Sequence, residues 1–130
     1  MQKHILPPPT APSVLVKGKV TYALWFSLYA QFPKTHRYTL GGKIESYFLD
    51  LLELIFISLY LSCEQKIPKL ILAVSKLEGI KFFLQLAWEN KCIATQKYSE
   101  LSCALAELGR IIYGWKCGIE KKERKQNSLT

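Results

Sequence analysis

Two acidic residues, Asp50 and Glu53, lie three positions apart in a segment that the sequence predicts to be helical. Three positions make about one turn of an α-helix, and two neighbouring carboxylates can act as general acid and general base. Because the residues around them are almost all apolar, we expect these acids to face the rim of a bundle or to pair with basic residues. The chain has no Walker-type loop, no dinucleotide-binding glycine pattern and no G-x-S-x-G segment. We therefore expect a protein that is not an enzyme.

The spacing of cysteine and histidine does not predict a metal site. The chain has no C-x-x-C pair, and neither His4 nor His36 lies at metal-ligand spacing from a cysteine. We expect free thiols in the reducing cytoplasm, with no metal or other cofactor. The first residues include Lys3 but no long apolar run, so we expect no secretory signal.

The charge of the chain favours an anionic partner. Its net charge is +8, and six lysines and arginines precede the first carboxylate, Glu45. Such an excess suggests a nucleic acid, an acidic protein or a membrane surface as the partner. The alternative is that the lysines only keep an apolar protein in solution.

Basic residues that could contact phosphates fall in two regions. One is a predicted loop, where Lys34 and Arg37 lie beside Tyr38. The other is a predicted helix on which five lysines fall within an arc of about 140°: Lys66, Lys69, Lys76, Lys81 and Lys91. The arc is not cleanly polar, because it also holds Leu70, Leu77, Ile80 and Leu84. Arg110 is a further candidate. Lysine arcs are also common on solvated helix faces, and Arg37 and Arg110 could instead pair with Glu45 and Glu107.

Proline and hydrophobic spacing predict four helices. Residues 1–13 are rich in proline and should form an extended, flexible tail. Apolar residues then recur every three or four positions, which predicts helices from about 14 or 20 to 32, then over 39–63, 68–91 and 95–117. Glycines at 109, 114 and 118 weaken the end of the last helix. We expect the bundle to span residues 14–117 and a charged, frayed tail to span 118–130.

Four helices with short links predict a single all-α domain, an antiparallel four-helix bundle. The helices at 39–63 and 68–91 are apolar on more than one side, and a large exposed apolar surface usually marks an interface. We expect a homo-oligomer or an obligate complex; the alternative is a core deeper than one stripe per helix. The apolar stretch 47–63 contains two acids and is too short to cross a bilayer, so we expect a buried helix and no membrane partner.

Four blocks of the sequence resemble the accessory variability determinant (Avd) proteins of diversity-generating retroelements. Residues 32–45 read FPKTHRYTLGGKIE, which is similar to the family pattern F-P-K-x-x-R-[FY]-T-L-G-x-x-I-E. The other blocks are LDLLELI at 49–55, LEGIKFFL at 77–84 and ELGRIIYGW at 107–115. The resemblance covers residues 23–115, in the family's order.

This resemblance implies a four-helix bundle that forms a ring-like homopentamer. Avd-like proteins bind the reverse transcriptase of the retroelement and nucleic acid, and they support error-prone copying of template RNA. Related four-helix proteins are encoded within intervening sequences of ribosomal RNA. The family's third helix carries basic residues for these partners. Lys81 lies at one such position, whereas Gln85 stands where the family often has arginine.

The sequence therefore predicts a cytoplasmic, non-catalytic accessory subunit that binds a reverse transcriptase and RNA or DNA through a basic surface. The alternative is a structural four-helix oligomer that binds only protein partners. The candidate binding residues are Lys34, Arg37, Lys66, Lys69, Lys76, Lys81, Gln85 and Arg110.

Overall fold

Residues 12–129 are described by a computed structural model, in which five α-helices follow one another and no strand occurs. They are α1 (Pro12–Tyr29), α2 (Lys34–Arg37), α3 (Leu40–Ser58), α4 (Cys63–Glu89) and α5 (Thr95–Leu129). The prediction of an all-α fold is confirmed. The additional helix, α2, is four residues long and lies where the sequence predicted a loop.

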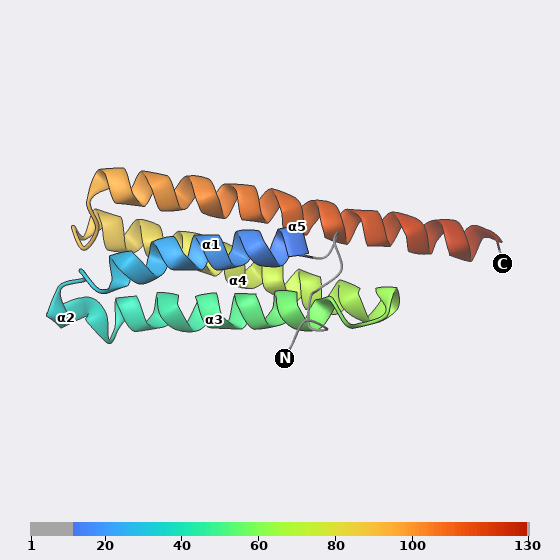
Figure 1. Cartoon of the computed structure of the whole chain (residues 1–130), viewed down its shortest axis with the longest axis horizontal. Helices are drawn as coiled ribbons and strands as arrows, with labels where there is room; N and C mark the ends of the chain where they lie inside the picture. The colour runs from blue at the N-terminus through green and yellow to red at the C-terminus, as the bar shows by residue number, and fades with distance from the viewer. Residues whose placement is uncertain (1–11, 130) are drawn as a thin grey trace, which may run out of the picture.

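The four long helices lie side by side and alternate in direction (Figure 1). α1 packs against α3 and α5, and α4 packs against the same two helices on the other side. Figure 1 shows α1 in front of α4, with α5 above and α3 below. α1 and α4 are therefore at diagonal corners of the bundle, and their outward faces point to opposite sides of the molecule.

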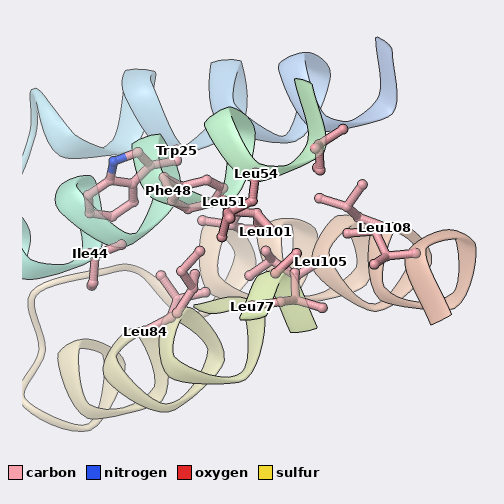
Figure 2. Packing of buried hydrophobic residues seen from close by; sticks show 14 of the residues in the cluster. Trp25, Ile44, Phe48, Leu51, Leu54, Leu77, Leu84, Leu101, Leu105 and Leu108 are labelled. Atoms are coloured by element: carbon pink, nitrogen blue, oxygen red, sulfur yellow. The ribbon is translucent and has the colours of Figure 1, made fainter. Parts of the chain in front are cut away.

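Apolar residues from all four long helices form the core (Figure 2). Trp25 of α1 and Phe48 of α3 stack with their ring centroids 5.9 Å apart. Further along the bundle, α4 and α5 contribute a series of fully buried leucines. Burial of apolar surface contributes about 25 cal/mol per Å², so this core holds the helices together. The buried leucines of α4 and α5 include Leu70, Leu77, Leu84, Leu101, Leu105 and Leu108.

Glu45 ties α1 to α3 inside the aromatic end of the bundle. Its carboxylate accepts hydrogen bonds from the Tyr22 hydroxyl and the Trp25 indole nitrogen, each 2.8 Å long. Burial and this hydrogen bond raise the pKa of Tyr22 to about 12. The carboxylate is thus satisfied by neutral donors.

Several helix ends differ from the predicted ones. α1 ends at Tyr29, three residues before Phe32, because the chain tightens into turns ahead of Pro33. α4 begins at Cys63, not near Pro68 as predicted, since the Ser62 side chain caps it by accepting from the Gln65 amide. α3 begins after Thr39, the predicted cap, although the Thr39 side chain makes no capping hydrogen bond.

The end of the chain departs most from the prediction. α5 continues to Leu129, whereas a frayed tail was predicted from residue 118. The added residues are mostly glutamate, lysine, arginine and glutamine, which favour helix, and single glycines cost only about 1 kcal/mol each. At the other end, Pro12 and Ser13 belong to α1, and the remainder of the predicted proline-rich tail lies outside the described residues.

Candidate interaction surfaces

The lysines of α4 lie on different sides of that helix. At about 100° per residue, the middle of the predicted lysine arc coincides with the buried face of α4, which contains Leu70, Leu77 and Leu84. Lys76 lies on the side that packs against α3, and Lys81 lies on the side that packs against α5. The predicted arc is therefore a stripe of core with lysines along both edges, not one basic surface.

Lys76 is engaged with α3. Its ammonium lies 3.1 Å from a carboxylate oxygen of Asp50 and 4.4 Å from the ring centroid of Tyr47. Asp50 thus pairs with a basic residue, one of the two arrangements that the sequence left open for the acids of this helix. Glu53, one turn later, is exposed.

Lys81 and Gln85 line a shallow groove between α4 and α5. The groove has a volume of about 370 Å³ and is completed by Glu78, Phe82, Tyr98 and Ser102. Both polar side chains already have partners within α4: Lys81 pairs with Glu78 at 3.2 Å, and Gln85 donates to Glu89 at 3.1 Å. These contacts are exposed, so a stronger partner could displace them at small cost.

Arg37 holds the connection between α1 and α3. Its guanidinium donates to the carbonyl oxygens of Ala30 and Phe32, each at 3.2 Å, and its own carbonyl accepts from the Tyr29 hydroxyl. The sequence suggested that Arg37 could pair with Glu45. This pairing is wrong, because Glu45 binds Tyr22 and Trp25 instead. Arg37 closes the turn through backbone carbonyls.

The sequence suggested that Glu107 could pair with Arg110. Glu107 pairs instead with Lys17 and so links α5 to α1. The hydrogen bond and charge of Lys17 lower the pKa of Glu107, and the charge of Arg110 adds a smaller effect in the same direction. Arg110 is exposed on the outward face of α5. Across residues 12–129, no ion pair involves Arg110 or the three remaining candidates, Lys34, Lys66 and Lys69.

Two apolar stripes are exposed at diagonal corners of the bundle. On α1, the outward face carries Val16, Val20 and Leu24, and Val16 is 54% exposed. On α4, the outward face carries Ile71, Leu72 and Phe82, and Phe82 is 61% exposed. The sequence predicted surplus apolar surface on the helices that became α3 and α4 but not on α1, and α3 also exposes Leu49 and Phe56, each by 49%. The sequence feature that could have predicted the α1 stripe is the near absence of charged residues on the face opposite Trp25.

A further basic surface lies near the end of α5, in residues that were predicted to form a frayed tail. Because α5 remains helical, Lys121, Lys122, Arg124 and Lys125 are held on one face. Lys122 and Lys125 line an open hollow of about 390 Å³ together with Cys63, the first residue of α4. The charge run was visible in the sequence, and a prediction of continued helix would have exposed this face.

Residues 12–129 hold no cluster of three or more histidine, cysteine, aspartate or glutamate side chains that could bind a metal ion. All four cysteines are free thiols, and only Cys92 among them is buried. None of the helices in this part of the chain combines the length and the hydropathy needed to cross a bilayer.

Comparison with known proteins gives one result. A family model described as bAvd-like matches residues 17–119, which include α3, α4 and most of α1 and α5 but exclude the first five residues of α1 and the last ten of α5. No curated protein matches the chain.

Proposed function

The chain belongs to the bAvd-like family, and we propose that it is a non-catalytic accessory subunit of the reverse transcriptase of a diversity-generating retroelement. The observation that carries this proposal is the family match, which covers residues 17–119 and so reaches all four long helices. In this role the protein binds the polymerase and its template RNA and so supports mutagenic copying.

Self-association fits the exposed apolar stripes. The stripes on α1 and α4 point to opposite sides of the bundle. A symmetric pair of copies would bury the same stripe of each copy and leave the other stripe of each copy exposed. A heterologous contact, in which the α1 stripe of one copy meets the α4 stripe of the next, buries both and generates a ring if the rotation closes. The pentamer implied by the resemblance is a ring of this kind.

Co-purification tests the proposal. The tagged chain should be expressed with a reverse transcriptase of a diversity-generating retroelement, and the eluate should be treated with nuclease. We expect the polymerase to remain bound after nuclease treatment, and we expect the isolated chain to bind RNA as well. A polymerase that never co-purifies contradicts the proposed role.

The alternative is a structural oligomer that binds protein only. One observation favours it: several candidate basic side chains are already engaged, namely Lys76 with Asp50 and Lys81 with Glu78, while Arg37 holds backbone carbonyls. Polymerase binding that survives nuclease, together with no RNA binding by the isolated chain at low salt, would support this alternative.

A further inference from the structure

The last turns of α5 have a strongly sided charge pattern. At about 100° per residue, Lys121, Lys122, Arg124 and Lys125 fall within one arc of about 160°, and we call these four residues the α5 basic face. This arc points away from buried Ile112 and Ile119 on the same helix. The two acids of the segment, Glu120 and Glu123, fall outside the arc.

The charges of the α5 basic face are not neutralised within the protein. Glu120 pairs with Lys116 at 3.2 Å, and Glu123 lines the hollow beside Cys63. Of the residues that the structure describes, none forms an ion pair with any member of the α5 basic face. In the body of the bundle, Lys17, Lys76 and Lys81 are paired, whereas Lys66 and Lys69 form no ion pair within residues 12–129.

α4 adds positive charge at the same end of the molecule. Lys122 and Lys125 line the open hollow with Cys63, and Lys66 and Lys69 follow Cys63 by about one and two helical turns. Figure 1 shows the beginning of α4 and the end of α5 together at one end of the bundle, with α5 projecting beyond the other helices. Two segments far apart in the sequence thus combine their charge.

We infer that the α5 basic face, together with Lys66 and Lys69, binds the phosphate backbone of RNA. The choice of RNA rests on the proposed function. The site itself lies mostly outside the family match, which ends at residue 119, and so is a property of this chain. Lysine and arginine side chains that meet phosphates displace bound counterions, which gives affinity with little sequence preference.

The composition of the face argues against other anionic partners. A helix that lies on a membrane needs an apolar face beside its basic one, and residues 120–128 contain no apolar side chain. The buried centres of protein–protein interfaces are depleted in lysine and enriched in aromatic residues, and this segment has no aromatic residue. A flexible polyanion is the partner best suited to a projecting helix of basic side chains.

A matched pair of full-length variants tests the inference. One is the triple variant Lys121→Gln, Lys122→Gln, Lys125→Gln; the other, Lys19→Gln, Lys91→Gln, Lys97→Gln, removes the same charge elsewhere. Glutamine retains helix propensity, and far-UV circular dichroism checks that both variants fold. Binding of a labelled oligouridine is measured by fluorescence anisotropy over a series of salt concentrations.

We expect the α5 variant to lower the slope of log affinity against log salt by about 2, since each single-strand phosphate contact contributes about 0.7. At low salt its Kd should rise by about tenfold or more, while the control variant stays near wild type. Equal slopes for the two variants would overturn the inference and leave RNA binding by the protein intact. A wild-type protein that binds no oligouridine would overturn both the inference and the RNA part of the proposed function.

A membrane role has its own readout in the same experiment. If wild-type protein sediments with vesicles of anionic phospholipid, the α5 variant does not, and oligouridine binding is the same for both, the face serves a membrane surface and the inference is wrong. Absence of vesicle binding, with weakened oligouridine binding by the α5 variant, supports the RNA assignment.

Discussion

Lys91 occupies a backbone conformation that favours glycine. It has a φ of 62° and follows α4, where the Lys91 amide bonds to the Trp88 carbonyl and the Cys92 amide bonds to the Ala87 carbonyl. This pair of bonds is the Schellman arrangement, which usually has glycine at the position of Lys91. A side chain there crowds its own backbone, and the strain is local.

Replacing Lys91 with glycine should therefore stabilise the protein. Relief of the left-handed strain exceeds the added freedom of the unfolded chain, and we expect a gain of about 0.5–1 kcal/mol. Chemical denaturation of wild type and Lys91→Gly measures it. Lys97→Gly, in the first turn of α5, is the control and should destabilise the protein, because glycine is a poorer helix former than lysine. A lower denaturation midpoint for Lys91→Gly would contradict this description of the turn.

Tyr22 should make the protein less stable at high pH. Its pKa is raised to about 12 in the fold, by burial first and then by the hydrogen bond to Glu45, whereas an ordinary tyrosine ionises near 10. The unfolded chain therefore loses this proton first, so the contribution is complete below about pH 10 and is lost as the pH rises toward 12.

The matched variants Tyr22→Phe and Tyr60→Phe separate this effect from other ionisations. Tyr60 is largely exposed. Unfolding free energies measured from pH 8 upward should fall less steeply for Tyr22→Phe than for wild type, and Tyr60→Phe should follow wild type. Identical slopes for all three proteins would show that Tyr22 is not responsible.

At the residue scale, the sequence identified the basic residues but not their partners. It left two arrangements open for Asp50, at the rim of the bundle or paired with a basic residue, because a carboxylate on an apolar helix needs water or a partner. It could not show that Arg37 binds carbonyl oxygens, since those oxygens become available only where α1 ends early. It also placed the lysines of α4 on an arc shared with Leu70, Leu77 and Leu84, and the structure shows that these leucines are buried core.

Among the elements, α3 and α4 are in close contact at Gly79. A Cβ atom on Gly79 would lie 2.4 Å from the Tyr47 ring, and that ring is held by an edge contact with Phe83 and by Lys76. Gly114 of α5, in contrast, has open space around it. The two glycines thus differ in packing, although both lie inside continuous helices.

Alanine at these two positions should have opposite effects. We expect Gly79→Ala to destabilise by about 1–2 kcal/mol through overpacking, and Gly114→Ala to stabilise by about 0.5–1 kcal/mol through helix propensity. Thermal unfolding of the two variants beside wild type measures both. A Gly79→Ala protein as stable as Gly114→Ala would mean that α3 and α4 are not so close.

At the element scale, hydrophobic spacing predicted the four long helices, because a periodic apolar stripe must be buried. The helix ends were harder to predict. Pro68 suggested a start for α4, but the Ser62 cap sets it earlier. The glycines of α5 suggested fraying, but the charged residues after them favour helix. Helix ends depend on small differences in capping and helix propensity, and hydrophobic periodicity carries no information about these.

At the scale of the whole molecule, single variants test the heterologous contact. Phe82→Gln removes the largest exposed side chain of the α4 stripe, and Val16→Gln changes the α1 stripe. Each variant alone should reduce the mass measured by light scattering, whereas Ser99→Gln on the outward face of α5 should not. Each variant retains the stripe that the other lacks, so an equal mixture should form a pair. No association in the mixture would contradict an α1-to-α4 contact.

The sequence predicted the all-α class and the surplus apolar surface of the helices that became α3 and α4. It did not predict the exposed stripe on α1, since the faces that stay exposed depend on which helices are neighbours. The family resemblance supplied the expectation of a ring, and the exposed stripes on α1 and α4 give that expectation a physical basis.

The mass of the complex with the polymerase tests the proposed role most directly. The chain and a reverse transcriptase of a diversity-generating retroelement should be co-expressed, treated with nuclease and measured by light scattering after size exclusion. We expect one species whose mass is that of the polymerase plus several copies of the 14.9 kDa chain. A polymerase that elutes alone, beside a monomer of 14.9 kDa with intact helical content, would contradict both the assembly and the accessory role.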